Sequence, residues 1–285
     1  MTTYAVTGAT GGLGGAAVTA LIARGVTPSD IVAFARDEAK ATALTEAGVV
    51  VRVADYEQSD ALDAALRGVD RLLLVSSPEV GKRSPQHRNV VDAAKRAGVA
   101  FIAYTSLLKA DTSSLLLADE HRETEAYLAD SGVDHALLRN GWYTENYAAS
   151  AQTAIDGGAL YGAAGPGVVA PAARGDFGDA AAAALIAPEA GRVYELAGSQ
   201  HLTYADIAAT FGEIAGTPVR YQDLPVADLK AALLDAGLPE GAAEIIADSD
   251  GGAAQGALDS SSTDLADLRG AESTPFVDVI RRALG

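Results

Sequence analysis

The residues with the clearest chemical potential stand near the start of the chain, in the segment Thr7-Gly8-Ala9-Thr10-Gly11-Gly12-Leu13-Gly14. This segment follows an apolar run and opens a helix-like stretch, and its glycines have the spacing Gly-x-x-Gly-x-x-Gly. Gly8 suits a tight turn, Gly11 lets the backbone approach a pyrophosphate, and Gly14 lets helix and strand pack closely. The helix N-terminus then offers free amides to the phosphates. The predicted nucleotide contacts here are Gly8, Thr10, Gly11, Gly12 and Leu13.

The ends of the next three predicted strands carry further candidate nucleotide contacts. Arg36 ends the second strand, where a guanidinium can grip the 2′-phosphate of NADPH, while the neighbouring Asp37 leaves NADH possible. Asp55 follows the third strand and could meet the adenine amino group or cap a turn. Ser76 and Ser77 end the fourth strand, either beside the nicotinamide ribose or in a plain loop. The pattern predicts NADPH as the preferred nucleotide.

Several strings along the chain resemble the quinone-reducing members of the NmrA-like branch of the atypical short-chain dehydrogenases. The specific ones are Pro85-Gln86-His87-Arg88-Asn89 and Arg139-Asn140-Gly141-Trp142-Tyr143. The resemblance implies an NADPH-binding Rossmann domain, a small C-terminal domain, a cleft between them, and reduction of quinones without flavin. It also implies a monomer or homodimer. Gly12 departs from the family pattern, which has a larger polar residue there. The cofactor contacts that the resemblance adds are Asn140, Gly141 and Trp142.

The chain lacks the Tyr-x-x-x-Lys pair with which standard short-chain dehydrogenases donate a proton. Aligned on the helix pattern that ends at Glu125, the tyrosine position holds Leu117 and the lysine position holds His121. Reduction of an unactivated ketone forms a basic alkoxide and benefits from general acid catalysis by ~10²–10⁴-fold. A quinone instead becomes a stabilised phenolate, which can take its proton from water later. The missing tyrosine therefore favours quinones and similar conjugated acceptors.

The remaining candidates concern the acceptor. No catalytic residue is certain; the candidates are His121, which could protonate the product or merely contact the cofactor, and Tyr104. Trp142 could stack near the ligand or belong to the core, and Gln86 and Asn146 could simply satisfy backbone groups. We interpret His87 as mainly structural. The predicted acceptor contacts are Gln86, Ser106, Tyr143 and Asn146.

The elements that must position these residues alternate regularly in the first half of the chain. Short, continuously apolar runs alternate with amphipathic stretches, which predicts an α/β protein with a doubly wound parallel Rossmann sheet. With the resemblance, we expect residues 1–141 to form the nucleotide-binding domain. Residues 142–285 are expected to form mainly a smaller α+β acceptor-binding region, parts of which pack back on the sheet. The small, polar segment Asp248–Gly256 predicts a loop or a frayed helix end.

Composition excludes several classes of function. The absence of cysteine removes thiol nucleophiles, disulfides and cysteine metal sites, and the four histidines show no ligand spacing, so no metal is expected. A net charge of −17, from 38 acidic and 21 basic residues, argues against nucleic-acid binding. The first six residues do not resemble a signal peptide, and the longest uncharged stretch, 157–173, is too rich in glycine and proline for a membrane helix. We expect a cytoplasmic protein.

Two other functions stay open. The same pocket would suit a reductase of triphenylmethane dyes or enones. The chain could also be an NADP-sensing regulator without turnover, like the NmrA regulator. A compact chain with no extra interaction segment weighs against the regulator.

Overall fold

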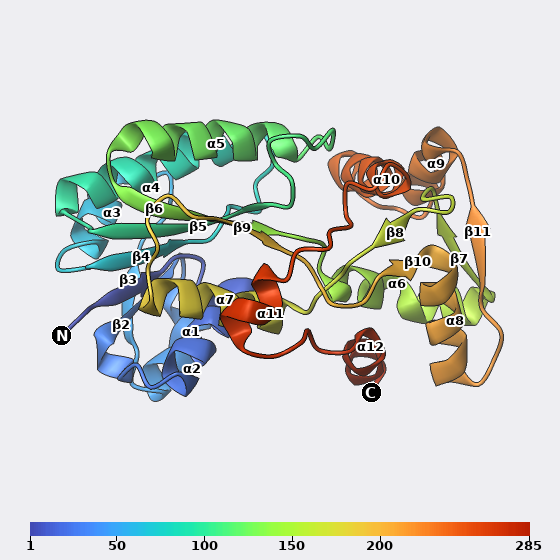
Figure 1. Ribbon diagram of the computed structural model, residues 1–285, viewed down its shortest axis with the longest axis horizontal. Coiled ribbons are helices and arrows are strands. Elements are labelled where there is room, and N and C mark those ends of the chain that lie inside the picture. The colour runs from blue at the N-terminus through green and yellow to red at the C-terminus, as the bar shows by residue number, and fades with distance from the viewer.

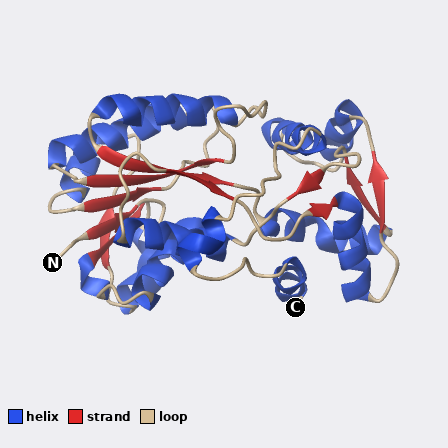
Figure 2. Ribbon diagram, in the orientation of Figure 1, coloured by secondary structure: helices blue, strands red, loops and turns tan.

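The computed structural model describes residues 1–285 and is built around a seven-stranded parallel sheet (Figures 1 and 2). The strand order is β3-β2-β1-β4-β5-β6-β9, so the direction of the crossovers reverses between β1 and β4. This topology confirms the predicted doubly wound Rossmann sheet. The strands are β1 (Tyr4–Val6), β2 (Ile31–Ala35), β3 (Val50–Val53), β4 (Arg71–Leu74), β5 (Phe101–Leu107), β6 (Asp134–Asn140) and β9 (Val193–Leu196).

Helices cover both faces of this sheet, which explains why its central strands are apolar throughout. Leu72 and Leu74 of β4 pack on one face, whereas Leu73 between them packs on the other, and all three are fully buried. The first face carries α3 (Ser59–Ala65), α4 (Arg83–Ala97) and α5 (Ala118–Ser131). The second face carries α1 (Gly12–Ala23), α7 (Arg174–Ile186) and α11 (Asp264–Arg269). A 3-10 turn at Pro28–Asp30 links α1 to β2, and a second 3-10 turn at Glu38–Ala41 with α2 (Thr42–Glu46) links β2 to β3.

Elements from the second half of the chain lie in two parts of the molecule, on the main sheet and in a smaller part of their own. β9 extends the main sheet beside β6, and α7 packs closely on α1, where a methyl group at Gly178 would lie 2.7 Å from the Ala16 side chain. The remaining elements form a smaller part at the other end of the molecule (Figure 1). These are α6 (Thr144–Gly157), β7 (Ala159–Gly162), β8 (Val168–Val169), β10 (Leu202–Thr203), α8 (Tyr204–Ala215), β11 (Arg220–Asp223), α9 (Val226–Asp235), α10 (Glu240–Ala254) and α12 (Phe276–Leu284).

The smaller part has its own sheets and core. β8 pairs antiparallel with β10, and β7 pairs parallel with β11. Tyr147, Tyr204 and Phe276 meet edge to face at the centre of this part, with ring centroids 5.7 and 5.9 Å apart. The division at residue 141 stays a prediction. No helix combines the length and hydropathy that a membrane span requires.

One local prediction is wrong: most of the segment 248–256 is helical and belongs to α10. Ser249 and Asp250 of this segment are buried, and the Asp250 carboxylate accepts hydrogen bonds from the Tyr204 hydroxyl at 2.5 Å and the Ala163 amide at 3.0 Å. The small residues of the segment serve packing, since any side chain at Gly252 would overlap Leu115. Burial raises the pKa of Asp250 to about 6. Tertiary contacts therefore override the weak helix propensity of this segment.

Candidate functional site

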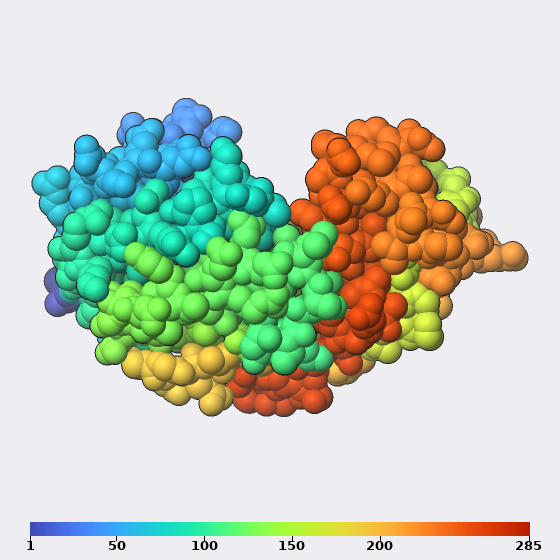
Figure 3. Space-filling view, turned by 90° about the horizontal axis from the view of Figure 1, so that it is seen from above, coloured from blue at the N-terminus to red at the C-terminus, as the bar shows by residue number.

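A cavity of about 600 Å³ lies at the carboxyl ends of the parallel strands. In open parallel sheets this edge, at the point where strand order reverses, is where ligands bind. Figure 3 shows the molecule hollowed between the N-terminal segments and the orange segment that holds α9 and α10. The cavity has two ends. Five residues line what we term the β2–β3 end: Arg36, Lys40, Asp55, Tyr56 and Glu79. The β5–β6 end is lined by Arg83, which contacts His121, and by Ser106, Leu107, Leu117, His121, Asn140, Gly141, Trp142, Tyr143, Asn146 and Arg174.

The glycine-rich turn lines the floor between the two ends. Gly8 has a φ of +59°, which favours glycine, and its carbonyl accepts the Gly11 amide at 2.9 Å. A methyl group at Gly14 would collide with the Gly8 carbonyl, so close packing requires glycine there. The first turn of α1 has no acidic residue, and no side chain caps its N-terminus. Its amides are thus left for an anionic ligand, and the turn fits a dinucleotide pyrophosphate.

The β2–β3 end is exposed and carries charges of both signs. The Arg36 side chain is 64% exposed, and its Nη1 lies 3.1 Å from Oε1 of Glu79. Lys40 lines the same end and was not predicted from the sequence. The Asp55 carboxylate accepts the Glu57 amide at 2.9 Å, so it caps the turn that follows β3. Asp55 nevertheless lines the cavity, and its contact with adenine stays a prediction.

The middle of the cavity is held by backbone hydrogen bonds from the β4 tip. The Ser76 amide donates to the Thr105 hydroxyl at 2.8 Å, and the Ser77 amide donates to Nε2 of His87 at 2.9 Å. Burial lowers the pKa of His87 to about 3, so the ring is neutral and its Nδ1–H donates to Thr124. His87 is absent from the cavity wall. His87 thus positions the serine segment through this hydrogen bond to Ser77. This is a structural role, as expected from the sequence.

Two of the residues that line the cavity each carry a buried side-chain oxygen with no hydrogen-bond partner. These oxygens are Oδ1 of Asn140, at the end of β6, and Oε1 of Gln86, on α4. Buried polar atoms without a partner cost free energy, so a ligand that donates hydrogen bonds would stabilise this arrangement. The carboxamide and hydroxyl groups of a nicotinamide nucleotide are such donors. The residues present therefore fit the predicted cofactor.

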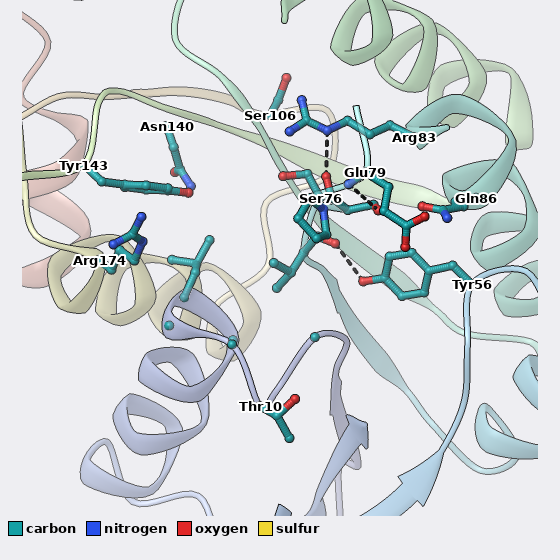
Figure 4. Close-up of a pocket in the computed structure, with 18 of the residues that line it drawn as sticks. Thr10, Tyr56, Ser76, Glu79, Arg83, Gln86, Ser106, Asn140, Tyr143 and Arg174 are labelled. Carbon is teal, nitrogen blue, oxygen red and sulfur yellow. Dashed lines mark hydrogen bonds between the residues drawn. The ribbon is translucent and has the colours of Figure 1, made fainter. Parts of the chain in front are cut away.

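Gln86 is separated from the other predicted acceptor contacts. Its side-chain nitrogen donates to Glu57 at 3.3 Å, and Figure 4 shows it beside Tyr56 and away from Tyr143. The structure thus brings together Ser106, Tyr143 and Asn146 at the β5–β6 end but places Gln86 toward the β2–β3 end.

The two catalytic candidates occupy different places. Tyr104 is fully buried and does not line the cavity; its hydroxyl lies 2.7 Å from Nδ1 of His121. The prediction of a role for Tyr104 at the acceptor is therefore wrong, because α5 covers that side chain. His121 and Leu117 both line the cavity. Burial, together with the Arg83 charge, lowers the pKa of His121 to about 3, so the ring is neutral near pH 7.

Two arginines that were not predicted from the sequence also line the cavity. Arg174, the first residue of α7, lies over the Tyr143 ring at 4.6 Å and donates to Oδ1 of Asn146 at 3.0 Å. Its Cδ lies 3.0 Å from where a Cβ on Gly12 would stand, so the missing side chain at Gly12 makes room for it. Arg83, on α4, donates from Nε to the Ser77 carbonyl at 2.6 Å. The only sequence signal for the position of Arg174 was Gly12, where the family pattern has a larger polar residue.

The hydroxyl of Ser106 is tied to a buried ion pair beneath the cavity. It donates to Oε1 of Glu125 at 2.5 Å, and Arg139 binds both oxygens of that carboxylate at 3.0 and 2.8 Å. The Ser106 proton is therefore committed, and Ser106 can only accept from a ligand. No group of acidic and histidine side chains is arranged to hold a metal ion.

The doubly wound sheet and its glycine turn define a protein with a Rossmann fold of the dinucleotide-binding type. Comparison with known proteins identifies the family. A model of the NmrA-like family matches residues 2–259. Quinone oxidoreductase 2 of Escherichia coli (strain K12) is 53% identical over 279 residues, which are 97% of this chain and 96% of that protein. The chain belongs to the NmrA-like family.

Solved structures agree with this assignment. The crystal structure of an NADPH-dependent quinone oxidoreductase from Escherichia coli complexed with NADPH matches with a TM-score of 0.96 and 51% identity, covering 99% of this chain and 100% of that one. The Citrobacter sp. triphenylmethane reductase complexed with NADP(H) matches with a TM-score of 0.93 and 35% identity, over 99% of this chain and 100% of that one. The family thus includes proteins named for different acceptors.

Proposed function

We propose that this protein is an NADPH-dependent oxidoreductase that reduces quinones by direct hydride transfer, without flavin or metal. The observation that carries the proposal is one cavity with two unlike ends: a glycine turn and Arg36 suited to the nucleotide, and a β5–β6 end where Leu117 takes the position of the usual tyrosine acid. The 53% identical relative named quinone oxidoreductase 2 supports it. When bound, NADPH supplies the hydride.

The residues of this chain would then bind and orient the two reactants. The amides at the start of α1 would hold the pyrophosphate, and Arg36 with Lys40 the 2′-phosphate. Asn140 and the serine segment at the β4 tip would hold the nicotinamide nucleoside over β4 to β6. Ser106, Tyr143 and Asn146 would bound the space for the acceptor. Such positioning replaces acid catalysis, because a quinone accepts hydride without prior protonation.

The test is the loss of the near-ultraviolet absorbance of NADPH with 1,4-benzoquinone, using the purified protein without added flavin or zinc. We expect steady turnover faster than the uncatalysed reaction. Turnover only after reconstitution with flavin or zinc would contradict direct transfer. Binding of NADPH without turnover of any quinone, dye or enone would favour the regulator.

We further propose that the protein works in the cytoplasm, on a diffusible acceptor, as a monomer or homodimer that binds neither nucleic acid nor membranes. Fractionation of cells tests the location and the absence of membrane binding, and light scattering of the purified protein tests the oligomeric state.

A further inference from the structure

Arg83 differs from the other arginines of the cavity in having no acidic partner. Arg36 pairs with Glu79, and Arg174 lies 4.0 Å from Glu145, whereas none of the ion pairs in the structure includes Arg83. Its guanidinium is half-buried and contacts only the Ser77 carbonyl and Nε2 of His121, at 3.4 Å. Burial lowers the pKa of this guanidinium, which still stays cationic. Such a charge is costly unless a ligand uses it.

The carboxylates near Arg83 form no ion pair with its guanidinium, because other groups already bind their oxygens. The Glu120 carboxylate accepts the backbone amides of Gly81 and Arg83, at 3.0 and 2.9 Å, and Glu125 is bound by Arg139. The only acidic residues that line the cavity, Asp55 and Glu79, belong to the β2–β3 end. The β5–β6 end therefore carries two guanidinium groups and no carboxylate in its wall.

His121 fixes the orientation of Arg83. A guanidinium can only donate hydrogen bonds, so Nε2 of His121 is the acceptor in their contact. The ring proton then lies on Nδ1 and donates to the Tyr104 hydroxyl at 2.7 Å. His121 consequently has no proton facing the cavity, and it holds Arg83 in place. Figure 4 shows the Arg83 guanidinium on the side of Ser106, above the β4 tip.

We propose that Arg83 is a catalytic residue that stabilises the negative charge formed on the acceptor, an inference that rests on the proposed function. A quinone that accepts a hydride, two electrons with one proton, becomes a hydroquinone monoanion, and NADPH is thereby oxidised to NADP⁺. The anion then takes a proton from water and leaves hydroxide behind. A preorganised cation in a partly desolvated site stabilises such an oxyanion without donating a proton.

The same charge selects the class of acceptor. Neutral quinones that become anions, and quinones that already carry a sulfonate, meet two guanidinium groups at the β5–β6 end. Cationic triphenylmethane dyes meet like charge there, and hydride transfer to them forms no anion for Arg83 to stabilise. Arg83 thus favours quinones over cationic dyes.

The kinetic experiment compares Arg83→Met with the matched control Arg88→Met. Arg88 is exposed on the same helix, lies over the Tyr127 ring at 5.1 Å, and does not line the cavity. We expect single-turnover reduction of 1,4-naphthoquinone to slow by ~10- to 100-fold in Arg83→Met and by less than ~2-fold in Arg88→Met. Arg83→Lys should lose less than Arg83→Met, because it keeps the charge. The rate with malachite green should fall less than the rate with the quinone, or rise.

A binding experiment separates this role from a structural one and from the proposed function. 4-Nitrophenol mimics the product, and its anion is yellow while the neutral phenol is not. Titration of the NADP⁺ complex should show a lowered pKa of the bound phenol in the wild type and in Arg88→Met, and no lowering in Arg83→Met. Equal pKa values in all three, or equal quinone rates in Arg83→Met and Arg88→Met, would overturn the role of Arg83. Absence of quinone turnover in the wild type would instead remove the proposed function.

Discussion

The two ends of the cavity differ in how far their charged side chains are exposed and in whether they have partners of opposite charge. At the β2–β3 end, Arg36 is exposed and shares its charge with Glu79, so water and salt screen its contacts. At the β5–β6 end, Arg83 is half-buried with no ion-pair partner, and His121 is held neutral. The exposed end is suited to recognise a phosphate that arrives with its own strong charge. The sheltered end is suited to act on charge that appears during the reaction, which explains why one cavity contains both.

The largest effect is expected where the two ends meet. Gly14→Ala places a methyl group against the Gly8 carbonyl and must push α1 away from the glycine turn. We expect affinity for NADPH and for NADH to fall together by more than ~100-fold, as measured by calorimetry. Gly157→Ala is the control, because nothing lies within 4 Å of the added methyl group. If the affinity fell for only one of the two nucleotides, the glycine turn would not be a binding surface that both share.

Arg36→Ala should weaken nucleotide binding at the exposed β2–β3 end and leave the β5–β6 end unchanged. Loss of a charge-assisted contact to the 2′-phosphate, worth ~1.5–3 kcal/mol, weakens NADPH binding by about 10- to 100-fold. NADH lacks that phosphate and should lose less than ~3-fold. The rate of hydride transfer at saturating nucleotide should not change. Equal weakening of both nucleotides would remove the assignment of Arg36 to the phosphate.

The pH dependence should differ between the ends. Between about pH 5.5 and 8 the hydride-transfer rate should be flat, because the pKa values of His121 and His87, about 3, lie well below this range. The affinity for NADP⁺ should fall by ~3- to 10-fold below about pH 6, since the 2′-phosphate then gains a proton. NAD⁺ binding is the control and should not follow this profile. A rate that titrates near pH 6.5 would mean that His121 is protonated during turnover.

Acid should also weaken the fold itself. Because both rings are neutral when folded and have an ordinary pKa of 6.5 when unfolded, the unfolded chain binds more protons as pH falls from about 6.5 toward 3. Stability is therefore lost over that window, so the binding series should stop where thermal melting shows unfolding.

The smallest effect is expected from Glu79→Gln, which removes the carboxylate that competes for Arg36. An exposed ion pair contributes ~0.2–1 kcal/mol, so NADPH should bind about 1.4- to 5-fold more tightly. Calorimetry at low and high salt measures this gain, which should shrink with added salt. Unchanged or weaker binding at low salt would show that Glu79 does not compete with the phosphate.

Local patterns in the sequence predicted most of the nucleotide end. Continuous apolar runs located the strands β1 to β6, and the glycine spacing located the turn whose Gly8 has positive φ. Arg36 could be placed because it ends a strand, and strand ends share one edge of a parallel sheet. The predicted contacts in this region all line the cavity, while their binding roles stay predictions.

The β5–β6 end was harder to predict because it depends on contacts between distant segments. Arg83 and Arg174 are unremarkable in sequence, and only the packing of α4 and α7 around the cavity brings them together. Tyr104 was misplaced because the pattern of β5 does not show that α5 covers it. Asp250 was assigned to a loop or a frayed helix end because its buried partners, Tyr204 and Ala163, lie far away in the chain.

The position of β9 has a consequence for how the protein is made. β9 supplies the hydrogen-bonding partner of β6, and α7 covers α1, although both elements follow residue 173. A nascent chain that has emerged only through residue 141 presents an unpaired sheet edge and an uncovered apolar helix. The β6 edge is paired and α1 is covered only after residues 174–196 have been translated, so completion of the first half depends on the second.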